Sequence, residues 1–273
     1  MADLSNSTIV HQKRGDVEYL QFRKLLEYED VLTHCYTLKA GELDFRKQNK
    51  ERLNQSCQKI CQILKIDKTR IVIPEQRHTN NVKLVKTLAQ GPSLWEEPFG
   101  QTDGILTNQK NIILTTTSSD CTNILLFDPI KKVIGSIHSG WRGTFQKIGK
   151  IAVEKMKEEY HCNPKDILCF LCPTIRKCHF EVHCDVKEPC EKIFSYTGQI
   201  NHIITPIGQV EGREKWTIDT VLINKLLLME AGVKTENIYD SGICSVCHKD
   251  KMHSLRGENG VLQGLNAAMI VLK

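Results

Sequence analysis

Short apolar runs rich in β-branched residues recur through the first half of the chain. They cover residues 71–73, 82–85, 112–117, 124–127 and 133–138. Runs of this length, bounded by polar or turn-forming residues, are typical of β-strands. We therefore predict a strand at each of these five positions.

A helical period follows the last of these runs. Apolar residues recur there every three or four positions, at Phe145, Ile148, Ala152 and Met156. This spacing predicts a helix over residues 144–160 that packs one face against the sheet, with Thr144 as its candidate N-cap.

A second helix is predicted over residues 220–231, because Gly232 follows as a C-terminal stop. No internal repeat, low-complexity tract or Pro/Gly/Ser-rich linker interrupts the chain. We therefore expect residues 1–273 to form a single domain of the α+β class, in which mixed β-sheets are flanked by helices.

Composition and charge narrow the classes of function. The chain has 40% hydrophobic and 25% charged residues, as a folded globular protein does. Its net charge of +5 is spread over mixed acidic and basic residues, so nucleic-acid binding is not expected. No stretch approaches the ~20 apolar residues of a membrane helix, and residues 1–16 lack the apolar core of a signal peptide. We expect a cytoplasmic protein without membrane contact, and the sequence leaves its oligomeric state open.

The chain contains twelve cysteines. In a reducing compartment such residues are buried thiols, metal ligands or nucleophiles more often than disulfides. Most of them are expected to be small apolar residues of the core.

A predicted hairpin brings two candidate ligands together. The turn signal at residues 128–131 separates the strands 124–127 and 133–137. If the turn is centred between Pro129 and Ile130, Cys121 and His138 lie directly opposite each other. Opposed residues have Cβ atoms about 4.5–5.5 Å apart, which lets a thiolate and an imidazole bind one zinc ion.

A catalytic zinc ion needs a third protein ligand and keeps one position for water or substrate. His78 is the best candidate, because it lies in a polar loop, residues 75–80, between two apolar runs. His78, Cys121 and His138 are therefore the candidate metal-binding and catalytic residues. The stretch that follows His138 contains Gly140 and Arg142, and we expect a sharp turn, a helix start and a planar cation that form an anion pocket there.

Several motifs resemble those of one known family. They are Gln76-x-His78, Thr102-Asp103-Gly104, Ser119-Asp120-Cys121, the stretch His138-Ser139-Gly140-Trp141-Arg142-Gly143, Cys172 to Ile175, Cys178 to Val182, Ile218-Asp219 with Asn224, Cys244, and His253 to Arg256. Together they resemble the laccase-domain family, also called the polyphenol oxidase or purine nucleoside phosphorylase family. The resemblance covers nearly the whole chain, and the stretch from His138 to Gly143 is specific.

The resemblance implies an arrangement of α/β/β/α layers and metal ligands at His78, Cys121 and His138. It also implies phosphorolysis of adenosine, inosine and methylthioadenosine, and adenosine deamination, with purine nucleosides and phosphate as partners. Zinc is the expected metal, and copper is possible. Gln76 joins Arg142 and Gly140 as a candidate substrate-binding residue.

The sequence departs from the family pattern at three places. Lys39 stands where many members have Arg, Arg176-Lys177 replaces Gly-Pro, and Met252-His253-Ser254 replaces an aromatic-rich motif. These changes bear on substrate preference more than on metal binding. The proton donor stays open among Asp103, Asp120 and Glu181.

Two other activities use the same residues. Two histidines and a cysteine suit copper, as in a polyphenol oxidase. However, none of the ten histidines has another two residues away, unlike the His-x-His pairs of a multicopper cluster. A cysteine hydrolase would use Cys121 as nucleophile and His138 as base, without His78 or a metal.

Two further cysteine patterns can be interpreted as haem or metal sites. Residues 244–248, Cys-Ser-Val-Cys-His, match the attachment motif of c-type haem, which we attribute to chance in a chain without an export signal. Cys169 and Cys172 could join Cys244 and Cys247 in a structural zinc site. The first pair lies in a strand-like run, residues 167–171, where core packing is the better interpretation.

Overall fold

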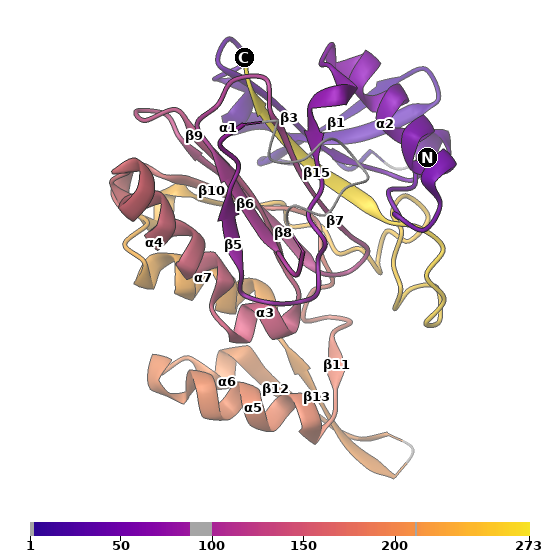
Figure 1. Ribbon diagram of the computed structural model, residues 1–273. Coiled ribbons are helices and arrows are strands. Elements are labelled where there is room, and N and C mark those ends of the chain that lie inside the picture. The colour runs from indigo at the N-terminus through magenta and orange to yellow at the C-terminus, as the bar shows by residue number, and fades with distance from the viewer. Residues whose placement is uncertain (1–2, 88–99, 211) are drawn as a thin grey trace.

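Two six-stranded sheets face each other in the part of the chain that the structure, a computed structural model, describes: residues 3–87, 100–210 and 212–273 (Figure 1). Sheet A has the strand order β1-β2-β3-β15-β7-β4, and sheet B has the order β14-β10-β8-β9-β6-β5. Both sheets are mixed, because β4 pairs parallel to β7, β5 to β6 and β14 to β10, while the other pairs are antiparallel.

The strands of sheet A are β1 (Ile9–Arg14), β2 (Val17–Phe22), β3 (Leu32–Thr37), β4 (Ile71–Val72), β7 (Ile113–Ser118) and β15 (Asn266–Leu272). Those of sheet B are β5 (Val82–Leu84), β6 (Gly104–Thr107), β8 (Thr122–Asp128), β9 (Val133–Ser139), β10 (Leu168–Leu171) and β14 (Ile238–Asp240). The five predicted strands are all present, although β4 and β5 each end one residue early and β7 begins and ends one residue late.

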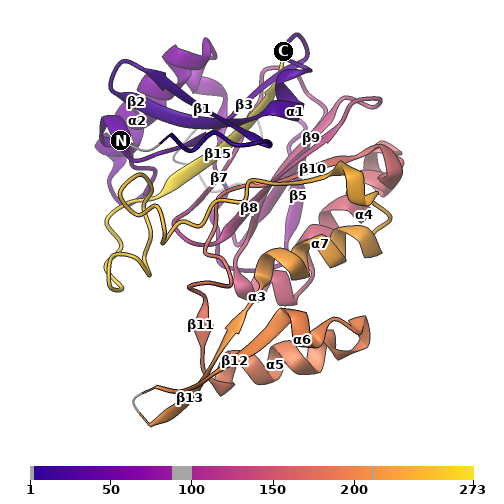
Figure 2. The ribbon, with the colours of Figure 1, turned by 180° about the vertical axis from the view of Figure 1, so that it is seen from behind.

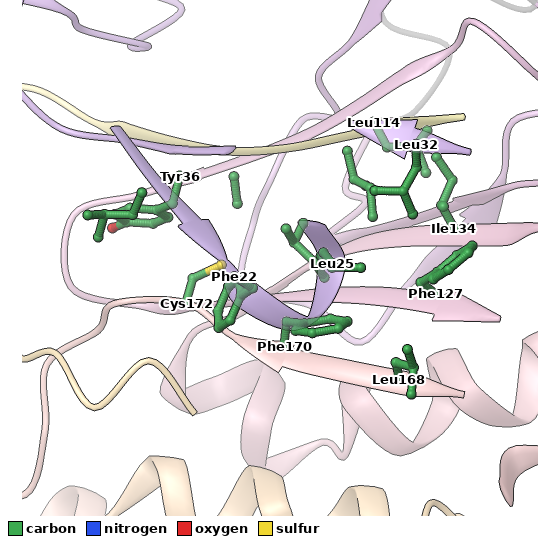
Figure 3. Packing of buried hydrophobic residues seen from close by; sticks show 14 of the residues in the cluster. Phe22, Leu25, Leu32, Tyr36, Leu114, Phe127, Ile134, Leu168, Phe170 and Cys172 are labelled. Atoms are coloured by element: carbon green, nitrogen blue, oxygen red, sulfur yellow. The ribbon is translucent and has the colours of Figure 1, made fainter. Parts of the chain in front are cut away.

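The space between the sheets is the main hydrophobic core. Figure 3 shows Phe22 of sheet A close to Phe170 of sheet B. The centroids of the two rings are 5.1 Å apart. The apolar run in β8 is continuous because both of its faces are covered. Leu125 and Phe127 point into this core, whereas Ile124 and Leu126 pack on the other side against helices.

Helices cover the two outer faces of the sheets. On sheet A lies α2 (Lys50–Leu64), and on sheet B lie α4 (Ile148–Tyr160) and α7 (Thr220–Glu230), as Figures 1 and 2 show from opposite sides. The short α1 (Arg23–Leu26) follows β2 directly. The α+β class and the expected α/β/β/α order of layers are thus confirmed.

A smaller sheet lies beside the layered body, at the lower end of Figure 1. It has the order β11-β13-β12, with strands β11 (Glu181–Val182), β12 (Ile204–Val210) and β13 (Arg213–Ile218). It packs with α5 (Cys184–Phe194), α6 (Ile200–Ile203) and one face of α7 around its own apolar cluster, which includes Phe194 and Ile218. The assignment of residues 1–273 to one domain stays a prediction.

The predicted helix over residues 144–160 is wrong at its start. The structure has two helices, α3 (Trp141–Phe145) and α4, separated by Lys147, whose φ of 64° lies in the left-handed region. Thr144 is inside α3 and not its N-cap, because its backbone N–H makes the helical hydrogen bond to the carbonyl oxygen of Gly140, 2.8 Å away. Gly140 is the N-cap.

The packing face of this segment is confirmed, since Phe145, Ile148, Ala152 and Met156 are all buried. The second predicted helix is present as α7, which ends at Glu230, one residue early. Gly232 follows with a φ of 96°, as expected of a C-terminal stop. None of the described helices is both long and apolar enough to cross a membrane.

Candidate metal centre and the adjoining pocket

The structure brings the three predicted ligand residues together at one end of sheet B. His78 lies in the loop between β4 and β5, Cys121 directly precedes β8, and His138 lies in β9. One donor atom of each lies within 4.8 Å of the others. Cys121 Sγ is 3.7 Å from His78 Nε2, and the two imidazole rings meet edge to face at 4.9 Å.

The predicted hairpin register is wrong, because the centre of the turn lies one residue later than predicted and the pairing is therefore shifted by two residues. His138 is opposite Asn123, not Cys121, because the turn is centred one residue later and Asp128 pairs with Val133. The Asp128 carboxylate causes the shift, since it accepts hydrogen bonds from the backbone N–H groups of Ile130 and Lys131.

Cys121 still lies near His138 in the shifted register. Side chains alternate between the faces of a strand with a period of two. A residue two positions from the opposed Asn123 is therefore a diagonal neighbour of His138 on the same face.

Asp103, which directly precedes β6, orients one of the histidines. Its side chain is fully buried, and its Oδ1 lies 2.8 Å from His138 Nδ1. Because a carboxylate accepts hydrogen bonds, this contact places a proton on Nδ1, so Nε2 is the ring nitrogen through which His138 would bind a metal ion.

The same carboxylate fixes the loop that carries His78. It accepts the backbone N–H groups of Arg77, His78 and Thr79 at 3.1, 3.0 and 2.7 Å, and the Thr79 hydroxyl at 2.8 Å. These bonds hold His78 at a φ of 60°, which is uncommon for a residue other than glycine. One buried side chain thus positions two of the three candidate ligands.

Gly140 lets the three side chains approach closely. A Cβ atom at this position would lie 2.5 Å from His78 Cδ2 and 3.0 Å from Cys121 Sγ. Any larger residue would therefore push the ligand side chains apart. Gly140 contacts the donor cluster, as well as capping α3.

The charges of the site are strongly coupled. Burial would raise the pKa of the Cys121 thiol, but His138 and His78 outweigh it and lower that pKa to about 6. Burial would lower the pKa of His138, yet Cys121 and Asp103 raise it to about 9. For Asp103, burial is outweighed by the hydrogen bond with His138, which lowers its pKa to about 2. The thiolate is therefore the favoured form of Cys121 at neutral pH.

A pocket of about 480 Å³ opens on one side of Cys121. Its lining is made of apolar, hydroxyl and charged residues: Asp120, Cys121, Thr122, Ser139, Trp141, Thr174, Ile175, Phe180, Thr220, Leu255, Arg256, Asn259 and Gly260. Arg256 comes from the motif near the C-terminus, and the sequence did not single it out as a site residue. A guanidinium near the donor cluster becomes apparent only when the chain is folded.

None of the three predicted substrate-binding residues, Gln76, Gly140 and Arg142, is among the described residues that line this pocket. The Gln76 side chain pairs with the backbone of Thr117, with bonds of 2.7 and 2.8 Å to its carbonyl oxygen and N–H. Arg142 is exposed, and its guanidinium lies 4.2 Å from the centre of the Trp141 ring.

The three candidate proton donors have different surroundings. Asp103 is engaged as described above. Asp120 accepts hydrogen bonds from the hydroxyls of Ser245 and Ser254, at 2.6 and 2.7 Å. Glu181 is exposed and pairs with Lys215 at 3.3 Å. Of the three, Asp120 alone is among the described lining residues of the pocket.

An α/β/β/α body with two imidazoles and a thiolate gathered at one sheet end defines a candidate metalloprotein. The comparisons identify its family. Residues 39–273 match the family described as multi-copper polyphenol oxidoreductase laccase, so the chain belongs to this family.

Proteins with assigned activities are similar to this chain. The purine nucleoside phosphorylase YlmD of Bacillus subtilis is 27% identical over 69% of this chain and 66% of its own length. The purine nucleoside phosphorylase LACC1 of Mus musculus is 32% identical over 56% of this chain and 34% of its own length. The adenosine deaminase RL5 of an unknown prokaryotic organism is 28% identical over 71% of this chain and 72% of its own length. The chain thus spans just under two thirds of the first relative and about a third of the second.

Two solved structures share the fold. The Bacillus licheniformis protein YfiH superposes with a TM-score of 0.84 at 22% identity, over 96% of this chain and 99% of that one. YlmD of Geobacillus stearothermophilus superposes with a TM-score of 0.81 at 21% identity, over 97% and 99%.

Proposed function

We propose that the chain is a zinc-dependent enzyme that acts on purine nucleosides, by phosphorolysis of adenosine, inosine and methylthioadenosine or by deamination of adenosine. The observation that carries the proposal is the double position of Cys121. It belongs to the cluster of three donor atoms and also lines the pocket of about 480 Å³. The names of the relatives supply the class of substrate.

The donor set fits a catalytic zinc ion. His78, Cys121 and His138 offer two nitrogens and one sulfur, and three protein ligands leave a position open for water or substrate. A bound zinc ion would supply Lewis-acid chemistry and would lower the pKa of water toward about 7. The same donors also suit copper, so metal analysis of protein purified without added copper identifies the native metal.

The pocket suits a nucleoside in size and in chemistry. Sites for small molecules are typically about 300–1,000 Å³ and mostly apolar, with a few polar groups that fix orientation. Trp141 and Phe180 offer aromatic faces for a purine ring. Hydroxyl groups such as that of Thr220 offer hydrogen bonds to a ribose.

Arg256 is the residue we propose for phosphate. Its guanidinium donates to the backbone oxygens of His179 and Glu181, each at 3.2 Å. The backbone N–H of Arg256 donates to the Asp120 carboxylate at 2.8 Å. These side-chain hydrogen bonds use three of the five N–H donors of an arginine, which leaves two donors for an anion. Arg142, stacked on Trp141 outside the pocket lining, becomes the second candidate.

The proton arrangement assigns a supporting role to Asp103. At neutral pH it is a carboxylate, with a pKa lowered to about 2, so it holds the Nδ1 proton of His138 and does not deliver a proton to substrate. We propose Asp120 as a positioning residue for Arg256, because the Arg256 backbone N–H binds its carboxylate. A metal ion bound to His138 would therefore take the place of the proton on Nε2, while Asp103 keeps the proton on Nδ1.

A direct test is chromatography of adenosine, inosine and methylthioadenosine after incubation with the protein, with and without phosphate. Free base and ribose phosphate formed only with phosphate indicate phosphorolysis, and inosine formed from adenosine without phosphate indicates deamination. Cys121→Ser is expected to lose either activity, whereas Cys184→Ser, at an exposed cysteine of α5, is expected to keep it. No turnover of any of these nucleosides by zinc-loaded protein would overturn the proposal.

The low pKa of Cys121 beside His138 makes a cysteine hydrolase the second candidate. In that reaction His78 has no part. Activity that survives a chelator but is lost on alkylation of Cys121 would favour the hydrolase. Activity lost on chelation and restored by zinc would favour the nucleoside enzyme.

A further inference from the structure

A second cluster of donor atoms lies where two loops meet, beside the pocket. It is formed by Cys178, His179, Cys244 and Cys247, and one ligand atom from each lies within 4.8 Å of the others. Cys178 Sγ is 3.6 Å from Cys244 Sγ and 3.9 Å from Cys247 Sγ. His179 Nδ1 is 3.1 Å from Cys178 Sγ and 3.6 Å from each of the other two sulfurs.

These separations are those of a tetrahedral metal site. Zinc bonds of about 2.3 Å to sulfur and about 2.0–2.1 Å to nitrogen place two sulfurs about 3.8 Å apart and a sulfur and the nitrogen about 3.5 Å apart. The observed sulfur separations of 3.6 and 3.9 Å fall on either side of the first value. Two of the three nitrogen separations, at 3.6 Å, agree with the second.

Ordinary core packing does not account for this cluster. Cys169 and Cys172 are fully buried among apolar residues, and burial raises the pKa of each thiol well above its ordinary value. They do not join Cys244 and Cys247, so the four-thiolate alternative is wrong and the preferred interpretation of this pair as core residues is confirmed. Cys178 and Cys247, by contrast, are exposed, which allows a metal ion to reach them.

Backbone groups also favour a thiolate at the inner corner of the cluster. Burial would raise the pKa of Cys244, but hydrogen bonds from the backbone of Cys247 and Arg176 lower it, whereas burial raises the pKa of Cys178 and of Cys247. Such amide contacts to the sulfur stabilise a metal-bound thiolate. The match of the four donors to a tetrahedron stands without this support.

We propose that Cys178, His179, Cys244 and Cys247 bind a second zinc ion, in a closed structural site. Three thiolates and one imidazole complete a four-coordinate zinc site and leave no position for substrate. The ion would join the segment after β10 to the loop after β14. Both segments reach the pocket, because Phe180 follows His179 in its wall and Ser245 binds Asp120.

Metal counting on the intact chain tests this proposal. Protein loaded with zinc and freed of excess is expected to hold about two zinc ions per chain. Cys121→Ser removes the first site only and is expected to keep about one. Cys247→Ser is also expected to keep about one, and the double variant almost none. The matched control Cys184→Ser is expected to keep about two.

Cobalt substitution in the Cys121→Ser variant gives a readout that does not depend on activity. A site with three thiolates and tetrahedral geometry is expected to show strong sulfur-to-cobalt absorption, and Cys247→Ser on this background is expected to abolish it. The absorption of the cobalt-loaded Cys121→Ser chain tests the site by itself, so the test stays intact even if the chain that also carries Cys247→Ser does not fold.

A Cys121→Ser chain that is folded but binds no metal would overturn the second site. So would a disulfide between two of these cysteines in freshly isolated, reduced-buffer protein, since it would use the sulfurs that the ion needs. Loss of the first ion alone would instead count against the proposed enzyme, so the two failures are distinguishable.

Discussion

The two donor clusters differ in their number of donor atoms, in their surroundings and in whether a bound metal ion would keep an open coordination position. The first has three donor atoms from distant loops and strands, and Cys121 opens onto a pocket of about 480 Å³. The second has four donor atoms on two loops and is partly exposed. Three protein ligands leave a metal ion able to bind a reactant, whereas four close its coordination. We therefore expect chemistry at the first cluster and stabilisation at the second.

The two clusters also differ in the contacts that hold their donor residues, which come from a side chain at the first cluster and from the backbone at the second. At the first cluster a buried carboxylate, Asp103, holds both the ring of His138 and the backbone of His78. At the second, Cys244 is held by backbone contacts, and the loop runs on from a bridge between Thr174 and Cys244. Fixed side chains favour a defined catalytic geometry, and fixed backbone favours a clip between segments.

The largest expected effect is loss of activity on removing a ligand of the first cluster. His138→Ala is expected to lower kcat/KM for nucleoside turnover by about 1,000-fold or more, which corresponds to about 4 kcal/mol. Cys247→Ser is expected to change it far less. Steady-state kinetics of the two variants makes the comparison, and an equal loss in both would contradict the division of roles.

Stability is expected to depend on the second cluster. A ligand present at 100 to 1,000 times its Kd stabilises a fold by about 3–4 kcal/mol. Cys247→Ser is expected to lower the free energy of unfolding by about this amount in zinc-containing buffer. Denaturant unfolding with and without a chelator measures it. The control Cys184→Ser is expected to behave as the unchanged chain. If a chelator destabilised Cys247→Ser as much as it destabilises the unchanged chain, the second zinc ion would not stabilise the fold.

Removing the charge of Asp103 is expected to have a smaller effect, limited to the first site. Partners that orient a metal ligand typically contribute about 10–100-fold to metal affinity. Asp103→Asn keeps the shape of the side chain but cannot accept all five hydrogen bonds as a carboxylate does. Competition with a chelator should show weaker binding of one ion and unchanged binding of the other. Weakened binding of both would mean that the variant perturbs the whole fold.

Much of the layered fold could be predicted from the sequence. The continuous apolar run of β8 indicates a strand covered on both faces, and the period from Phe145 to Met156 identifies the helical face on sheet B. The helix α2 was not predicted, although Leu53, Cys57, Ile60 and Cys61 repeat every three or four residues along it. Its polar composition and its cysteines hide that period.

Local hydrogen bonds and backbone conformation account for the errors in the predicted hairpin register and helix start. The Asp128 carboxylate shifts the hairpin by one residue, and the left-handed Lys147 divides one expected helix into two. Neither is visible in a hydrophobic pattern. The three donors of the first cluster carried a motif, but Asp103 gains its role only by folding against residues 77–79. The pair Cys178-His179 has no standard ligand spacing, so its partnership with Cys247 required the tertiary structure.

The smallest effect distinguishes the two arginines near the first cluster. Arg256 lines the pocket, whereas Arg142 is exposed and stacked on Trp141. A hydrogen bond to a charged group contributes about 1.5–3 kcal/mol, so Arg256→Ala is expected to raise the phosphate KM by about 10- to 100-fold. Arg142→Ala is expected to change it by less than about 3-fold, as an exposed charge does. Initial rates at varied phosphate measure both. The reverse order would assign phosphate to the start of α3, and no change in either would leave phosphate outside this pocket.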